Sequence, residues 1–375
     1  MIYLDYSATT PVDKRVLSTF NKVCEEYPGN SNSLHKLGAA SKELETYATS
    51  KIEELLCLKN MEIIYTSGAT ESNNHVIKGV ASKYQNRGKH IITTYLEHAS
   101  VLAPLNYLSS HGFTIDYVKI KDDGLVDLEH LKQLLTNDTI LVSICAVDSE
   151  LGIKQPLNEI AEIIKEYPKC FFHSDCTQAL GKINIDFNLF DFASVSAHKI
   201  YGMKGIGLLI KKKNIILDNL IHGGSSTTAY RSGTPALPLI VSTMKAIDLI
   251  IPNIDKNYQH MESLKQKILN NLKDYQDISI NTTNNSISST INISLKNIKP
   301  ETFIHALDEQ DIYISTKSAC STKEPMSNAV YAVTKDREKA KSSIRITLSY
   351  LTTEEEIDKF LDIFALSYQK LNIKG

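Results

Sequence analysis

Residues 140–147 read Ile-Leu-Val-Ser-Ile-Cys-Ala-Val, a nearly unbroken apolar run of strand length. In a strand with one solvent face, apolar and polar residues alternate, whereas a strand covered on both faces is apolar at successive positions. Strands of the second kind are typical of parallel sheets, because crossover helices pack on both faces of such a sheet. The run therefore predicts a central strand of an α/β protein.

Similar short runs occur between about residues 60 and 212, and segments of helix length such as Leu157–Lys165 lie between them. The strands expected from these runs are Met61–Ser67, His90–Thr94, Phe113–Val118, Thr139–Val147, Phe171–Asp175, Phe192–His198 and Gly205–Lys211. Alternating strands and helices are typical of α/β proteins, so we expect a doubly wound sheet with helices on both faces.

The character of the sequence changes after residue 235. Leu239–Lys273 predicts a long helical stretch, and the Asn-, Ser- and Thr-rich tract Asn281–Ser289 predicts a surface loop. A strand, Thr290–Leu295, and an amphipathic helix, Thr353–Leu371, are expected after it. These elements predict a second, smaller domain of the α+β type.

The length of the chain also favours two domains. Its 375 residues compare with about 150 for an average domain, and a chain of this size can bury a core without disulfides or structural metals. We expect residues 13–250 to form a large domain, and residues 1–12 together with 251–375 to form a small one.

The composition argues against several classes of protein. Lys and Arg number 41 and Asp and Glu 43, a formal net charge of -2, which disfavours a nucleic-acid binder or a polybasic membrane protein. The longest apolar runs are of strand length, well short of the roughly 20 residues of a membrane helix. Residues 1–6 lack the basic and apolar regions of a secretory signal. We therefore expect a cytoplasmic protein with no membrane and no direct nucleic-acid contact.

The cysteines are scattered and form no C-x-x-C pair, so they predict neither a disulfide framework nor a zinc site, and no metal is expected. They are Cys24, Cys57, Cys145, Cys170, Cys176 and Cys320. Most of them are interpreted as small, buried apolar residues. Cys320 differs because it lies in the small, polar segment Ser318-Ala319-Cys320-Ser321-Thr322, which is typical of an exposed loop.

Polar residues follow two of the expected strands, at the sheet edge where α/β proteins bind ligands. The segment 66–73, Thr-Ser-Gly-Ala-Thr-Glu-Ser-Asn, offers hydroxyls and backbone N–H groups that suit a phosphate, although such residues also cap ordinary helices. Asp175 ends the strand Phe171–Asp175, and Gln178 follows one helical turn later. Asp175 either caps the next helix or holds a heteroaromatic nitrogen protonated.

A lysine, Lys199, follows the strand that begins at Phe192. Ser196 and His198 lie beside it as anion donors, and the glycines of the segment 201–207 permit close packing. A lysine that forms a Schiff base next to a phosphate requires this combination of groups.

Taken together, these segments resemble the cysteine desulfurases of the NifS/IscS type, within the fold-type-I, class V aminotransferase group of pyridoxal 5'-phosphate (PLP) enzymes. The matching segments are Tyr3–Pro11, Thr66–Asn74, Glu97-His98, Asp175–Gln178, Ser196–Gly207, Arg231–Thr234, Ser318–Cys320 and Ser343–Arg345. They occur in order over nearly the whole chain. The resemblance implies an aspartate aminotransferase-like fold: a large PLP-binding domain with a mixed, mostly parallel seven-stranded sheet, and a small domain that carries a catalytic cysteine loop.

The resemblance implies a role for each matching residue around PLP. Lys199 would form the Schiff base and move the substrate's Cα proton, Asp175 would pair with the pyridinium nitrogen, and His98 would stack on the ring and shuttle protons. The remaining cofactor contacts would come from Ala69, Thr70, Ser149, Gln178, Ser196, His198 and, from the neighbouring subunit of a homodimer, Thr234. Arg345 would clamp the substrate carboxylate with its bidentate guanidinium group, and Asn30 would also contact the substrate.

The activity that the resemblance implies is conversion of L-cysteine to L-alanine. Cys320 would attack the sulfur, become a persulfide and pass the sulfur to an acceptor protein, which requires a thiolate that can move. Members of this group supply iron–sulfur scaffolds or tRNA-thiolating enzymes, and the divergent cysteine loop favours a tRNA-thiolating acceptor here.

Several positions depart from the pattern of the family. Where the family has Val-Asn-Asn-Glu, this chain has Val147-Asp148-Ser149-Glu150. The Gly-rich segment of the family continues here as Ser225-Ser226-Thr227. In addition, Lys317 replaces a common glycine, and Ser31 replaces the proline of Gly-Asn-Pro-Ser-Ser. Loss of one hydrogen bond at Ser149 would weaken substrate binding by about 1 kcal/mol. We therefore expect modest activity that an acceptor stimulates. Two alternatives remain open: selenocysteine lyase or another class V aminotransferase activity, and an inactive scaffold for sulfur-relay proteins.

Overall fold

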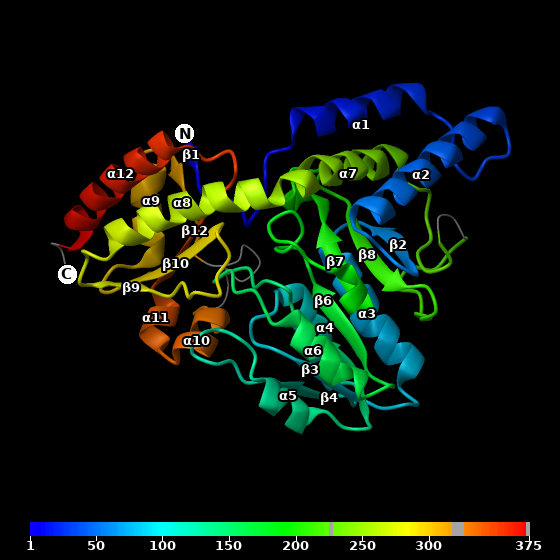
Figure 1. Cartoon of the computed structure of the whole chain (residues 1–375), viewed down its shortest axis with the longest axis horizontal. Helices are drawn as coiled ribbons and strands as arrows, with labels where there is room; N and C mark the ends of the chain where they lie inside the picture. The colour runs from blue at the N-terminus through cyan, green and yellow to red at the C-terminus, as the bar shows by residue number, and fades with distance from the viewer. Residues whose placement is uncertain (225–227, 317–325, 373–375) are drawn as a thin grey trace.

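The computed structural model describes residues 1–224, 228–316 and 326–372 (Figure 1). Its largest sheet has seven strands in the order β2-β8-β7-β6-β5-β3-β4. These strands are β2 (Met61–Thr66), β3 (His90–Thr93), β4 (Thr114–Tyr117), β5 (Thr139–Ser143), β6 (Phe171–Asp175), β7 (Phe192–Ser196) and β8 (Gly207–Lys212). β8 pairs antiparallel with both β2 and β7, and the other pairings are parallel. The predicted mixed, mostly parallel seven-stranded sheet is confirmed.

The apolar run that predicted the sheet is buried on both of its faces. Leu141 and Val142 are adjacent on β5 and both fully buried, yet they belong to different apolar cores. β5 itself ends at Ser143, earlier than expected, although the backbone N–H groups of Ile144 and Ala146 still donate to carbonyls of β6. Burial on both faces explains why the run shows no alternation of polar residues.

Helices cover the large sheet and flank it (Figure 1). They are α1 (Lys14–Glu26), α2 (Lys36–Leu55), α3 (Ala69–Tyr84), α4 (Ala99–Ser109), α5 (Leu128–Leu134), α6 (Leu157–Lys165) and α7 (Leu237–Ile250), with the short 3₁₀ turns η1 (Phe187–Leu189) and η2 (Ala197–Lys199). Apolar residues of α3 and α4 form the core on one face of the sheet, and those of α6 contribute to the core on the other.

The C-terminal part of the chain has its own sheet and core. β9 (Ile278–Ile280), β10 (Thr290–Leu295) and β12 (Ser343–Thr347) form an antiparallel sheet in the order β12-β10-β9, and β1 (Ile2–Tyr3) pairs in parallel with β11 (Ile312–Tyr313). The helices of this part are η3 (Ile251–Asn253), α8 (Ile254–Leu272), α9 (Pro300–Asp308), α10 (Asn328–Thr334), α11 (Arg337–Lys341) and α12 (Glu354–Asn372). Ile2 and Leu4 share an apolar core with α8 and α12, so the first strand joins the last third of the chain. The exact domain boundaries stay a prediction.

The Asn-, Ser- and Thr-rich tract is irregular, as expected, and residues 282–285 are at least partly exposed, but the expectation of a surface loop is wrong for the rest of the tract. Asn281, Ser286, Ser288 and Ser289 are buried. The tract packs against the segment that follows β5, where the N–H of Ile287 donates to the carbonyl of Gly152 at 2.8 Å. Composition indicated a loop, but the contact between the two parts of the chain determines its burial.

The expected long helical stretch is divided. Pro252 lies in η3 between α7 and α8, where its ring cannot continue an α-helix. By length and composition alone, Leu237–Leu272 could cross a membrane, so the expectation that apolar runs are only of strand length is wrong here. Half of its most apolar window is buried inside the protein, and a buried core helix meets the same criterion, so this is weak evidence for a membrane span.

Candidate active site

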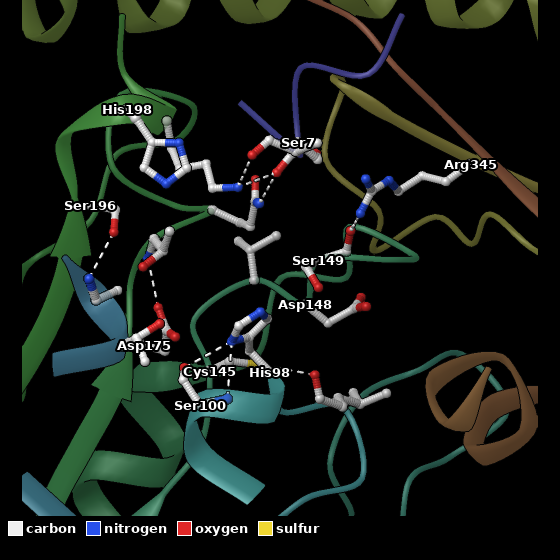
Figure 2. Close-up of a pocket in the computed structure, with 18 residues that line it drawn as sticks. Ser7, His98, Ser100, Cys145, Asp148, Ser149, Asp175, Ser196, His198 and Arg345 are labelled. Carbon is white, nitrogen blue, oxygen red and sulfur yellow. Dashed lines mark hydrogen bonds between the residues drawn. The ribbon is translucent and has the colours of Figure 1, made fainter. Parts of the chain in front are cut away.

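A cavity of about 180 Å³ lies beyond the carboxyl ends of the central strands, and its walls come from both parts of the chain (Figure 2). It is lined by Ser7, Ala8, Ala69, Thr70, Leu96, His98, Ser100, Cys145, Val147, Asp148, Ser149, Asp175, Thr177, Gln178, Ser196, His198, Lys199 and Arg345. This is the edge at which α/β sheets bind ligands.

Asp175 occupies the floor of the cavity at the end of β6 and is 6% exposed. Its Oδ1 accepts from the backbone N–H of Thr177 at 3.0 Å, and its Oδ2 accepts from Nδ2 of Asn73 at 2.8 Å. These two donors fix the carboxylate plane, so the group is held in one orientation at the cavity wall.

His98 is the N-cap of α4, and its ring is oriented by the first turn of that helix. Nδ1 accepts from the backbone N–H of Ser100 at 3.1 Å and lies 2.8 Å from the Ser100 hydroxyl, which in turn accepts from Nδ2 of Asn73 at 2.8 Å. Because Nδ1 is an acceptor, we assign the proton of the neutral ring to Nε2. Asn73 thus connects the carboxylate of Asp175 with the imidazole of His98.

Lys199 ends η2, directly after β7. Its Nζ donates to the backbone carbonyls of Ser7 and Ala8, at 2.5 and 2.6 Å. The same Ser7 carbonyl accepts from Nε2 of Gln178 at 3.0 Å, and Oε1 of Gln178 accepts from Nζ of Lys182. The N-terminal segment therefore closes the cavity above the lysine.

The N-terminus of α3 forms an anion-binding corner of the cavity. Its N-cap, Gly68, has no side chain to cap the helix, and the N–H of Ala69 donates to Oγ of Ser196 at 2.7 Å. His198 lies next to it, and burial together with the charges of Lys199 and Lys204 lowers its pKa to about 4, so its ring is neutral at pH 7. A helix N-terminus flanked by hydroxyls and an imidazole suits a phosphate group.

Arg345 reaches the cavity from β12 and is 1% exposed. Its guanidinium group donates to the carbonyl of Ser149 at 2.7 Å and to Oδ1 of Asp5 at 2.8 Å. Nε is buried and has no hydrogen-bond partner among the described residues. A buried guanidinium whose Nε–H has no partner is suited to a carboxylate ligand.

Asp148, which stands where the family pattern has an asparagine, caps the turn after β5 with its carboxylate. Asp148 accepts from the N–H groups of Glu150, Leu151 and Ile153, each at 2.9 Å. Burial raises its pKa to about 6. This turn places Ser149 at the cavity wall.

The structure brings most of the predicted site residues together. Those that line the cavity are Ala69, Thr70, His98, Ser149, Asp175, Gln178, Ser196, His198, Lys199 and Arg345. Asn30 does not line it: it lies exposed on the turn between α1 and α2, where its Oδ1 accepts from the N–H of Asn32. Thr234 lines a different cavity, together with Arg231 and Gly205. Cys320 and Lys317 lie outside the described residues.

The other cysteines separate into buried and exposed ones. Burial raises the pKa of the thiols of Cys145, Cys170 and Cys176, so these are not thiolates at neutral pH. Cys24 and Cys57 are exposed. Within residues 1–224, 228–316 and 326–372, no group of three or more His, Cys, Asp or Glu side chains could hold a metal ion.

Sequence reasoning assigned no role to several residues that shape the site. Asn73 lies one helical turn after Ala69, and its position in a hydroxyl-rich turn was the available signal. Lys182 follows Gln178 by four residues on the same segment. The carbonyls of Ser7 and Ala8 carried no signal, because any residue type supplies a backbone carbonyl.

These groups fit PLP. The cavity contains a fixed carboxylate for a ring nitrogen, a lysine amine, an imidazole and a helix N-terminus for a phosphate. Two of the buried polar side-chain atoms without hydrogen-bond partners among the described residues, Nε of Arg345 and Oγ1 of Thr177, belong to residues that line this cavity.

Comparison with known proteins agrees with this geometry. Residues 2–360 match the model of the family "Aminotransferase class-V". The chain belongs to that family, whose members use PLP. It is 39% identical over 376 residues to the cysteine desulfurase IscS of Dictyoglomus turgidum, covering 99% of this chain and 95% of the relative. It is 40% identical to the IscS of Rickettsia felis, covering 99% and 92%. Within the family, the chain is a PLP-dependent cysteine desulfurase.

Solved structures give the same result. A NifS-like protein superposes with a TM-score of 0.91 at 35% identity, covering 97% of this chain and 98% of the other. The structure described as "SspA in complex with cysteine" superposes with a TM-score of 0.82 at 30% identity, covering 94% and 100%. The expected aspartate aminotransferase-like fold is therefore confirmed.

Proposed function

We propose that this enzyme converts L-cysteine to L-alanine and holds the sulfur as a persulfide on Cys320 before an acceptor protein takes it. The observation that carries the proposal is the convergence of Lys199, Asp175, His98 and Arg345 on one cavity. The solved relative that contains cysteine supports the choice of substrate.

Each group that lines the cavity has a task in this reaction. When bound, PLP supplies an electron sink for negative charge at the substrate's Cα. Asp175 would keep the ring nitrogen protonated, and the corner formed by Ala69, Thr70, Ser196 and His198 would hold the phosphate. Gln178 and Ser149, which line the same cavity, would offer hydrogen bonds to the polar groups of the cofactor.

The reacting protons and the substrate are handled by three further side chains. Lys199 would hold the cofactor through Nζ and would move the proton at the substrate's Cα. His98, with its proton on Nε2, would hold the cofactor ring in the cavity and act as a proton shuttle. Arg345 binds the substrate carboxylate, which orients Cα toward Lys199.

Cys320 takes the sulfur in this proposal. Its thiolate attacks Sγ of the bound substrate, so that an S–S bond forms while the substrate's Cβ–S bond breaks. The electron pair remains on Cβ, which then receives a proton to give alanine. A thiol–disulfide exchange of the same kind passes the outer sulfur to a thiol of the acceptor.

The experiment compares Lys199→Ala and Cys320→Ala with Lys169→Ala, at an exposed lysine that does not line the cavity. Absorbance of the purified proteins with PLP, before and after L-cysteine, is measured together with alanine, sulfide and protein-bound persulfide. We expect Lys199→Ala to lose the visible cofactor band, and Cys320→Ala to keep the band and its response to cysteine but to form no persulfide.

Two results would overturn the proposal. A visible band that survives in Lys199→Ala would remove the assignment of the cofactor lysine. Persulfide and sulfur transfer at the wild-type level in Cys320→Ala would remove the assignment of the sulfur carrier. Lys169→Ala serves as the control and should match the wild type in every measurement.

We further propose a cytoplasmic homodimer that delivers sulfur to a tRNA-thiolating enzyme, with an iron–sulfur scaffold as the alternative acceptor. Large apolar side chains such as Leu34, Leu37 and Tyr47 are exposed on and beside α2, which supports burial of this region in a dimer. Asn30 lies on the same turn as Leu34 and would then act, like Thr234, on the site of the partner.

A further inference from the structure

Lys182 is a lysine beside the cavity for which the reaction described above has no task. It does not line the main cavity, but its Nζ donates to Oε1 of Gln178, which does. Lys182 and Lys199 together line a second, smaller cavity of about 20 Å³. The two lysines therefore lie near each other beneath the N-terminal segment that contains Ser7.

The hydrogen bond from Lys182 determines which way the Gln178 amide faces. Below its pKa of about 7, Lys182 is an ammonium group, which can only donate, so the amide atom next to it is the oxygen. Nε2 of Gln178 consequently faces the Ser7 carbonyl, at 3.0 Å, beside the 2.5 Å hydrogen bond from Lys199 to the same oxygen. With the amide reversed, its NH₂ group would oppose the ammonium of Lys182. Gln178 therefore presents a donor on the side of Lys199.

Lys182 also places positive charge near Lys199. Burial, followed by the charges of Lys199 and Arg345, lowers the pKa of Lys182 to about 7. Repulsion between two ammonium groups is mutual, so a charge on Lys182 disfavours a proton on Nζ of Lys199. A nearby cation is one of the ways in which a lysine amine is kept reactive.

Other charged and titratable groups also face these two lysines. The groups that line either cavity are Tyr6, His98, Cys145, Asp148, Asp175, His198, Tyr201, Arg345 and Tyr350, and Lys204 acts on His198 from the neighbouring loop. Lys182→Met alters none of these groups chemically, so a change in titration that the control variant lacks is assigned to Lys182.

We propose that Lys182 is a positioning residue, whose ammonium group holds the Gln178 amide as a donor and whose charge favours the unprotonated form of the Lys199 nitrogen. The proposal rests on the function proposed above, because it concerns the cofactor-binding lysine of that reaction.

The test uses the holoenzyme and three variants. Lys182→Met keeps the length of the side chain without its charge or donors, Lys182→Arg keeps both, and Lys169→Met is a control at an exposed lysine. The visible cofactor band is titrated with pH, and the dissociation constant of PLP is measured. For Lys182→Met we expect a midpoint raised by about one pH unit and PLP affinity lowered about tenfold. Lys182→Arg and Lys169→Met should keep the wild-type midpoint.

A separate variant tests the amide orientation. Gln178→Glu keeps an acceptor for Lys182 but has no donor for the Ser7 carbonyl, so PLP affinity should fall about tenfold. Affinity equal to the wild type would overturn this half of the proposal. The variant also decides this half if Lys182→Met does not fold.

Two further results would overturn the half that concerns charge. One is a folded Lys182→Met protein whose cofactor band titrates at the wild-type midpoint. The other is a Lys182→Arg protein whose midpoint shifts as far as that of Lys182→Met. The Lys199→Ala experiment tests the proposed function separately from the Lys182 variants. If Lys199→Ala loses the visible cofactor band, the proposed function stands whatever the Lys182 variants show. If Lys199→Ala keeps that band, the proposed function is overturned.

Discussion

At the scale of single residues, burial changes the protonation of a carboxyl group next to the site. Glu97 is 6% exposed, and its Oε1 accepts from the Thr94 hydroxyl at 2.9 Å and from the N–H of Cys145 at 2.8 Å. Oε2 is buried without a hydrogen-bond partner among the described residues. Burial raises the pKa of Glu97 from 4.5 to about 8, so this carboxyl is largely protonated at pH 7.

This shift predicts a pH dependence of stability. Between pH 4.5 and about 8 the folded protein holds a proton on Glu97 that the unfolded chain has released. The free energy of unfolding should therefore fall as pH rises through this window, by about 1.4 kcal/mol per pH unit from this group. Glu97→Gln should remove that slope, and Glu43→Gln, at an exposed position of α2, should keep it. Urea unfolding of the apo protein at several pH values checks this; equal slopes in Glu97→Gln and wild type would contradict it.

At the scale of elements, the anion-binding corner depends on close packing between β8 and the start of α3. Gly207, the first residue of β8, pairs with Thr66 on one side and Ser196 on the other. A Cβ built there would lie 2.5 Å from the carbonyl oxygen of Val195 and 2.6 Å from Cα of Gly68. Only glycine allows the α3 N-terminus to approach this closely.

Gly207→Ala should therefore displace Gly68 and the first turn of α3. We expect PLP affinity to fall about tenfold or more and the protein to be destabilised by about 1–3 kcal/mol. Gly224→Ala is the control, because a Cβ at that position meets nothing within 4 Å. Fluorescence titration with PLP and thermal unfolding give the two measurements. A Gly207→Ala protein with unchanged PLP affinity would show that the close approach is not needed for binding.

At the scale of the whole molecule, the single chain leaves Thr234 away from its own site. Thr234 is exposed and lines a different cavity from Lys199. If Thr234 completes the phosphate site of a partner subunit, each active site in a symmetric dimer takes residues from both chains.

Subunit mixing tests this arrangement. Lys199→Ala and Thr234→Ala should each have low activity alone, whereas refolding them together creates mixed dimers with one site that has both residues. We expect recovery of about a quarter of the wild-type activity, because half of the randomly formed dimers are mixed. Mixing two preparations of Lys199→Ala is the control and should recover nothing. No recovery in the true mixture would place Thr234 in the site of its own chain or outside it.

The sequence by itself determined the elements of this protein and the chemistry at their ends. Strand-forming runs such as residues 140–147 are recognisable because burial on both faces leaves a local pattern of successive apolar residues. Asp175, Ser196 and Lys199 could be placed at the site because parallel strands bring their carboxyl ends to one edge. The extent of β5 and the burial of the Asn-, Ser- and Thr-rich tract were misjudged, since both depend on what packs against them.

Only the tertiary structure decided how these groups are held. Arg345 meets Asp5 across 340 residues of chain, and Lys199 meets the carbonyl of Ser7 across 192. The same holds for the link from Lys182 through Gln178 to that carbonyl. Such contacts leave no periodic signal, because their geometry comes from the packing of the N-terminal segment between the two parts of the chain. Local sequence specifies which groups are present, and long-range packing specifies which atoms they face.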